Sequence, residues 1–245
     1  MSLFKKLFGS SPKENEPVVE DINKVGFKVF PRIKNQEWDA LSSIYHIPLG
    51  GDLVVVFVQD INDRIIYITN DDIQNEAVKQ SVKQWKENIK EVSFELFSPE
   101  SWNNRIYFNQ PNDYSNEKVF DSEFIRKACE LLGTSKLIIS ISRRHRMQIT
   151  SYDEDFPNLE NFFFSHFSIW RATNLDDEII TEMVLIAEKD CITHVVPLGF
   201  RMNMYEKDGK RVLDYSTMDD LGDKIDFQQI IENKKIAVNS ELFKD

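Results

Sequence analysis

Residues 137–152 read LIISISRRHRMQITSY. Both ends of this stretch are rich in isoleucine and other strand-forming residues, whereas the middle is a block of four basic residues. The pattern predicts two strands, 137–142 and 147–152, around a basic turn. One continuous long strand stays open as the alternative, because no glycine fixes a turn type.

Further strand pairs are predicted on both sides of this stretch. Each consists of two short apolar segments joined by residues that favour turns, which is typical of β-hairpins. A short strand is also expected at 105–108. The predicted pairs are 53–58 with 65–68, 182–187 with 191–196, and 202–205 with 211–215.

Apolar residues at helical spacing predict four helices among these strands. The clearest begins behind a cap at Thr69–Asp72 and continues to Val92. The others are 121–133, which Gly133 ends, a largely buried helix from an Asn158 cap to Thr173, and 226–232.

Together these elements predict an α+β fold of mixed, mostly antiparallel sheets with packed amphipathic helices. Residues 1–21 combine prolines, serines and charges without a sustained period, and we expect a flexible tail there. The loop-rich stretch 98–115 favours two small lobes, 22–110 and 111–245. A single domain is the alternative.

The composition restricts the classes of function. Lys and Arg number 30 against 41 Asp and Glu, so the formal net charge is -11 and nucleic acid is not expected as a partner. The two cysteines, Cys129 and Cys191, lie in apolar stretches and are interpreted as core residues in a reducing compartment. No apolar run is long enough to span a bilayer, so we expect a cytoplasmic protein.

The first nine residues form a separate pattern. Leu3, Phe4, Leu7 and Phe8 fall on one face of a short helix, with two lysines opposite. This segment, Met1–Gly9, is suited to weak contact with a membrane surface or a partner's groove. A frayed tail is the favoured alternative, because isolated helices this short are marginal in water.

Several segments of the chain are similar to those of a known family, namely 53–60, 66–73, 85–89, 137–152 and 187–193. They resemble the YtpQ-like family of bacterial proteins of unknown function over roughly residues 50–196. The resemblance implies a cytoplasmic bacterial protein without known catalytic residues. This chain departs from the family in its basic block 143–146 and its extended N-terminus.

Motifs for common catalytic chemistry do not occur in the sequence. It contains neither a glycine-rich phosphate loop nor a nucleophile elbow, and no histidine pair with zinc spacing. His166 lies among phenylalanines and is interpreted as a core histidine bonded to the backbone. The sequence therefore predicts no cofactor, no metal and no catalytic residue, although whether the protein is an enzyme stays open.

The basic block is the best candidate for a ligand site, because guanidinium groups bind carboxylates and phosphates through paired hydrogen bonds. His145 is expected to titrate near neutral pH there. The alternatives are a solvated turn, or arginines paired with the acids at 153–155. The candidate residues are Arg143, Arg144, His145, Arg146 and Tyr152.

Two hypotheses for function follow. The favoured one is a non-enzymatic protein-binding module, an adaptor or an immunity-type inhibitor, whose acidic surface attracts a basic protein partner. The alternative is an enzyme or sensor that binds a small anionic ligand at the basic block.

Overall fold

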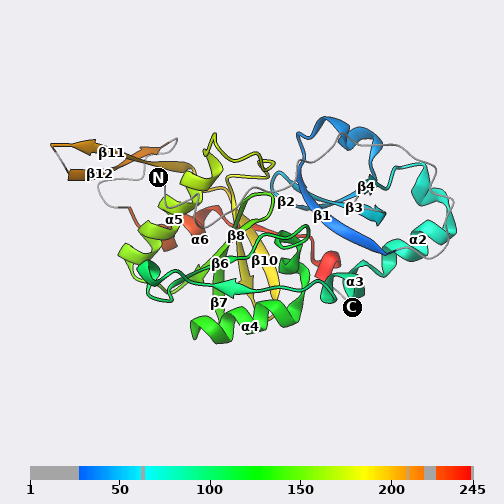
Figure 1. Cartoon of the computed structure of the whole chain (residues 1–245), viewed down its shortest axis with the longest axis horizontal. Helices are drawn as coiled ribbons and strands as arrows, with labels where there is room; N and C mark the ends of the chain where they lie inside the picture. Colours follow the sequence, from blue (N-terminus) through cyan, green and yellow to red (C-terminus); the bar gives the residue numbers. More distant parts are fainter. Residues whose placement is uncertain (1–27, 62–63, 209, 218–224, 244–245) are drawn as a thin grey trace.

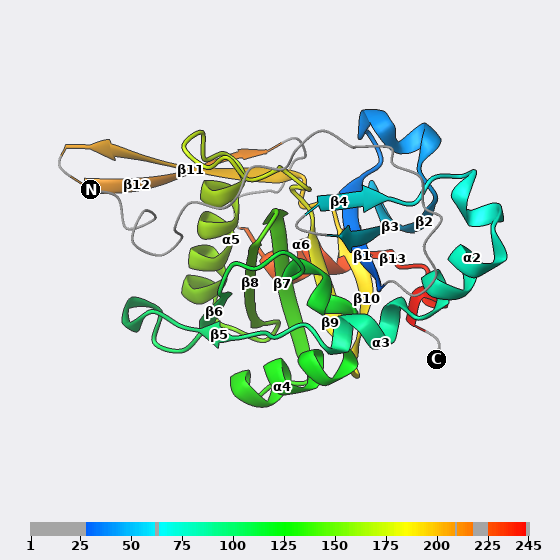
Figure 2. The ribbon, with the colours of Figure 1, turned by 45° about the vertical axis from the view of Figure 1, so that its right-hand side comes forward.

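The computed structural model describes residues 28–61, 64–208, 210–217 and 225–243, and it has the predicted α+β class (Figure 1). The predicted tail and the Met1–Gly9 segment lie outside these residues. A seven-stranded sheet and a four-stranded sheet lie side by side, and a two-stranded hairpin projects from one end (Figures 1 and 2).

The seven-stranded sheet has the order β13-β10-β9-β7-β8-β6-β5, and each of its neighbouring pairs is antiparallel. The stretch 137–152 forms its central hairpin, as predicted. The strands are β5 (Leu96–Phe97), β6 (Ile106–Asn109), β7 (Lys136–Arg143), β8 (Arg146–Ser151), β9 (Val184–Glu188), β10 (Cys191–Val196) and β13 (Ile236–Ala237).

The four-stranded sheet is built around β3, whose apolar side chains are buried from Leu53 to Val58. β1 pairs along one side of β3, and β2 and β4 share the other side. The projecting hairpin contacts the body through α5. These strands are β1 (Val29–Asn35), β2 (His46–Gly50), β3 (Leu53–Ile61), β4 (Arg64–Tyr67), β11 (Phe200–Lys207) and β12 (Lys210–Thr217), and α5 is Phe156–Trp170.

The prediction of one continuous helix from Thr69 to Val92 is wrong, because the helix starts later and is broken. Thr69 and Asp72 exchange hydrogen bonds with each other, so this segment closes a single turn of 3₁₀ helix. Asn75 caps the helix instead, and a break at Gln84 divides it. The pieces are η2 (Asp72–Gln74), α2 (Glu76–Lys83) and α3 (Trp85–Lys90).

Two of the other helices begin where their caps predict, and α4 also ends where predicted. Asp121 caps α4 and Gly133 ends it in a left-handed conformation with φ of 63°, which glycine adopts without strain. Asp226 caps α6. The cap of α5 is Asp155 rather than Asn158. The remaining elements are α4 (Ser122–Leu132), α6 (Phe227–Lys234), η1 (Asp39–Ser43), η3 (Glu100–Trp102), η4 (Asn116–Phe120) and η5 (Ser240–Phe243).

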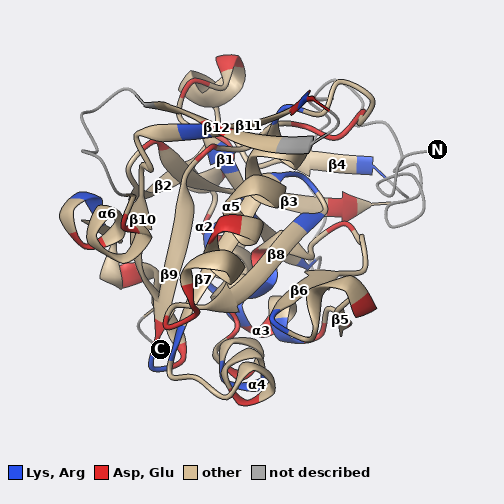
Figure 3. Ribbon diagram, turned by 90° about the vertical axis from the view of Figure 1, so that its left-hand side faces the viewer, with Lys and Arg blue, Asp and Glu red and all other residues tan. Residues whose placement is uncertain are grey.

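Alternating side chains on the large sheet supply two cores. On β7, Leu137, Ile139 and Ile141 face a core shared with the four-stranded sheet, α2, α3 and α4, whereas Ile138 faces the other core. α5 covers that second face (Figure 3). Phenylalanines of α5 and α6 contribute to this core. Cys129 and Cys191 are half-buried free thiols, and Cys129 packs against the first core.

The boundary expected near residue 110 falls directly after β6. β5 and β6 precede it, but they belong to the large sheet, because β6 pairs with β8. The two-lobe organisation stays a prediction.

His166 on α5 is a core histidine, as expected. Its Nε2–H donates to the Glu182 carbonyl at 3.0 Å, so its Nδ1 accepts from the Ser140 hydroxyl at 2.7 Å. The ring is fully buried, and this burial lowers its pKa to about 4.

His166 should make stability depend on pH. The unfolded chain binds a proton at this residue below about pH 6.5, whereas the folded chain does so only near pH 4. The free energy of unfolding should therefore fall by up to about 3 kcal/mol from this residue as the pH drops from 7 to 4. The free energy of unfolding, measured by urea titration at several pH values, should fall more steeply with decreasing pH in the wild type than in His166→Gln. Parallel plots of this free energy against pH would contradict the assignment.

Candidate functional site

The basic block lies at the turn between β7 and β8, and its side chains are buried. The exposed fractions are 5% for Arg143, 2% for Arg144, 8% for His145 and 2% for Arg146. The alternative of a solvated turn is therefore wrong. His145 takes the left-handed conformation, with φ of 62°, that closes the turn without glycine.

Arg144 connects the seven-stranded sheet with the four-stranded sheet. Its guanidinium donates to Glu117 of η4 at 2.5 Å, to Glu178 at 3.2 Å and to the backbone carbonyl of Ile33 in β1 at 2.6 Å. Burial alone would lower the pKa of Arg144, but the two carboxylates outweigh it and raise the pKa. This side chain is thus a fixed cation with protein acceptors on three segments.

The neighbouring arginines hold the segment after α5. Arg143 donates to backbone carbonyls from Ile169 to Asp177, two of which belong to the last turn of α5. Arg146 pairs with the Asp177 carboxylate at 2.7 Å. Arg144 and Arg146 therefore pair with Glu117, Asp177 and Glu178. The prediction that the arginines pair with the acids at 153–155 is wrong.

His145 and Tyr152 do not join these arginines in a site. The Nδ1–H of His145 donates to the Asn112 carbonyl, and burial lowers the pKa of the ring, so titration near neutral pH is not favoured. Tyr152 lies beyond the opposite end of β8, where it donates to Glu232. Its distance along the strand from Arg146 is about 20 Å, at roughly 3.3 Å per residue.

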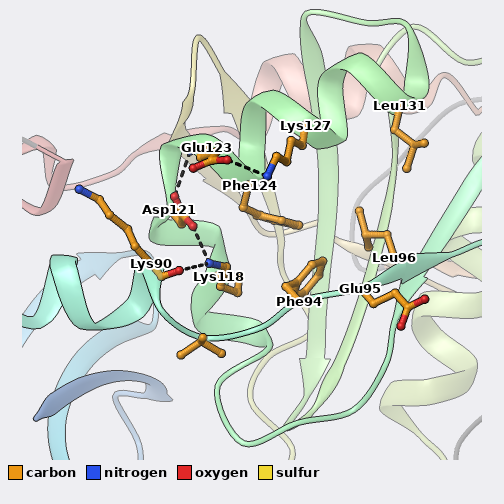
Figure 4. A pocket seen from close by; sticks show the side chains of 11 residues that line it. Lys90, Phe94, Glu95, Leu96, Lys118, Asp121, Glu123, Phe124, Lys127 and Leu131 are labelled. Atoms are coloured by element: carbon orange, nitrogen blue, oxygen red, sulfur yellow. Dashed lines mark hydrogen bonds and ion pairs between the residues drawn. The ribbon is translucent and has the colours of Figure 1, made fainter.

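A different place in the fold is open to a ligand. A hollow of about 460 Å³ lies between α4 and the segment that leads from α3 into β5 (Figure 4). We call it the α4 groove. It is lined by Lys90, Val92, Phe94, Glu95, Leu96, Lys118, Asp121, Glu123, Phe124, Lys127 and Leu131.

The floor of the α4 groove is apolar. The rings of Phe94 and Phe124 meet edge to face with centroids 4.4 Å apart. Leu131 extends from α4 with 48% of its surface exposed, whereas the apolar face of that helix is otherwise turned into the core. Val92 and Leu96 are half-buried along the other wall. Apolar side chains thus form the part of the groove between Phe94, Leu96 and Leu131.

The charges around the floor are largely paired with one another. Lys127 pairs with Glu123 at 2.7 Å along α4, and Lys90 pairs with Glu87 at 2.8 Å. Glu95 is exposed on the opposite rim, and within the described residues its carboxylate has no ion pair (Figure 4).

A buried ion pair fixes the base of the groove. Lys118 and Asp121 are 2.5 Å apart, with side chains only 5% and 6% exposed. Lys118 also donates to the Ile89 carbonyl at the end of α3, and Asp121 accepts the Glu123 amide as the cap of α4. Two residues therefore tie α3, η4 and α4 together.

Sequence reasoning missed this groove. Its walls come from residues 90–96 and 118–131, which no local motif connects. The residue that points to the groove is Leu131. It fits the apolar helical pattern of α4, yet it is exposed in the structure.

Comparisons of the chain with protein-family models, with curated proteins and with solved structures find no match. The resemblance to the YtpQ-like family therefore stays a prediction. Within the described part of the chain, no cluster of three or more His, Cys, Asp or Glu side chains is arranged to hold a metal ion. None of its helices is both long and apolar enough to cross a membrane.

Asp121 should contribute more to stability than an ordinary helix cap. Asp121→Asn keeps an acceptor for the Glu123 amide but leaves the buried Lys118 without its carboxylate, so we expect a loss of about 2–4 kcal/mol in chemical denaturation. Asp121→Ala should lose about 1 kcal/mol more.

Asp155 provides the matched control, because it caps α5 from an exposed position. Asp155→Ala should cost only about 1 kcal/mol. Equal losses in Asp121→Ala and Asp155→Ala, which both remove the cap, would show that the pair with Lys118 contributes nothing.

Proposed function

We propose that the protein is a protein-binding module whose α4 groove holds a short amphipathic, basic segment of a partner protein. The observation that carries this proposal is the apolar floor of the groove, open to solvent between charged rims. Contiguous exposed apolar surface bounded by polar residues is characteristic of interaction sites.

The dimensions of the groove favour a helical segment. α4 forms one wall and has 11 residues, which corresponds to about 16 Å. A partner helix of about three turns matches this length and would place side chains at i, i+3, i+4 and i+7 on the floor. The rings of Phe94 and Phe124 supply the aromatic surface that commonly anchors such segments.

The charges favour a basic partner. The chain carries a net charge of -11, which attracts cations at long range and speeds their encounter. At the groove itself, the lysines of the rim already have carboxylate partners, whereas Glu95 is available to a lysine of the incoming segment. An adaptor or an immunity-type inhibitor would act in this way.

The alternative, an enzyme or sensor for a small anion at residues 143–146, has less support. The guanidinium groups there already donate to carboxylates and carbonyls of the protein, so an anion would have to displace buried partners.

The proposal is tested with a fluorescein-labelled 14-residue peptide that has leucines at i, i+3, i+4 and i+7 and lysines elsewhere. Titration of the full chain, followed by fluorescence anisotropy, should show saturable binding. Leu131→Glu should weaken it about tenfold, because losing the burial of this side chain is equivalent to about 1.4 kcal/mol.

Two controls make the result specific. Ile236 is 42% exposed on β13, at the opposite edge of the large sheet from β5, so Ile236→Glu should leave the affinity unchanged. A peptide with glutamates in place of lysines should bind more weakly. Absence of saturable binding, or equal effects of the two substitutions, would overturn the proposal.

A further inference from the structure

We infer that the α4 groove has an occupant within the same chain, the segment Met1–Gly9, which competes with a partner for the floor. The inference extends the proposed function by adding regulation of the same site. It depends on where the described chain begins, on the chemistry of this segment and on the length of chain between them.

The described chain begins beside the segment that forms one wall of the groove. Lys28, its first residue, forms an ion pair with Glu91. Glu91 lies between Lys90 and Val92, both of which line the groove (Figure 4). The side chain of Asn88 also bonds to the Val29 carbonyl, which holds the start of β1 against α3. The described chain therefore begins next to the groove.

The sequence of the segment fits the floor and the rim. Leu3, Phe4, Leu7 and Phe8 provide four large apolar side chains on one helical face, which suits the hydrocarbon of the floor. Lys5 and Lys6 provide cations for the exposed carboxylate of Glu95 on the rim. The segment thus has the same chemistry as the basic amphipathic partner proposed above.

The intervening chain is long enough. Residues 10–27 number 18, and a flexible chain of this length has an end-to-end distance of about 24 Å, against about 60 Å when fully extended. The groove extends for about 16 Å along α4. A segment attached by such a chain has an effective concentration of order millimolar, so even weak docking competes with a partner in solution.

The first arm of the test removes the apolar face of the segment in the full chain. The variant Leu3→Ser/Phe4→Ser/Leu7→Ser/Phe8→Ser should bind the leucine–lysine peptide about 5- to 10-fold more tightly than the wild type, because the competitor is gone. The matched control is Val18→Ser/Val19→Ser, which changes apolar residues between the segment and the body and should leave the affinity unchanged.

The second arm detects docking without any peptide. A photoreactive benzoylphenylalanine in place of Phe4 should cross-link to the groove peptides that contain Phe94, Leu96 or Leu131, identified by mass spectrometry. The same group in place of Val18 should not. Mixing isotopically light and heavy chains distinguishes cross-links within one chain, as the inference requires, from cross-links between two chains, which would overturn it.

The outcomes separate the inference from the proposed function. If the peptide binds in a manner sensitive to Leu131→Glu but the serine variant binds no tighter, the inference is overturned and the proposed function stands. If the peptide binds neither protein, the proposed function fails, and the cross-linking alone decides the inference: groove cross-links support it and their absence overturns it.

Discussion

The hydrogen bonds of the Arg144 guanidinium are the interaction on which the arrangement of the seven-stranded and four-stranded sheets depends. The guanidinium lies at the tip of the central hairpin, yet it is buried and bonded to η4, to the segment before β9 and to β1. A charge in such a place is tolerated only when every nearby segment supplies an acceptor in the right geometry. The network therefore fixes how β1 and η4 meet the hairpin.

This constraint extends to the α4 groove. Glu117 of η4 accepts both Arg144 and the Ile33 amide, so η4 has little freedom to move. The next residue, Lys118, points to the base of the groove and bonds to α3 and to Asp121. The buried network on one side of η4 thus positions the open hollow on the other side.

The local signals in the sequence predicted much of the fold. The hairpins, the Asp121 and Gly133 caps of α4 and the buried position of His166 follow from residues close together in the chain. The helix start at Thr69 was wrong because a threonine and an aspartate that can cap a helix can also bond to each other. Local patterns do not decide between those two arrangements.

The environment of the basic block could not be predicted in this way. Arg144 finds its acceptors 27, 34 and 111 residues away, and nothing in the stretch 143–146 indicates them. A solvated turn was the natural expectation for three arginines, because arginine is rarely buried unless it is paired. The α4 groove could not be predicted for the same reason, because its two walls are distant in the sequence and meet only in the folded chain.

The most direct test of the account is a double-mutant cycle between Arg144 and Glu117, measured by urea denaturation. Arg144→Met leaves Glu117 buried without its cation and should lower the free energy of unfolding by about 3–5 kcal/mol. Arg144→Met/Glu117→Gln should be less destabilised than the sum of the single variants by about 1–3 kcal/mol. A loss below about 1 kcal/mol with additive effects, as for an exposed ion pair, would contradict the role given to this contact.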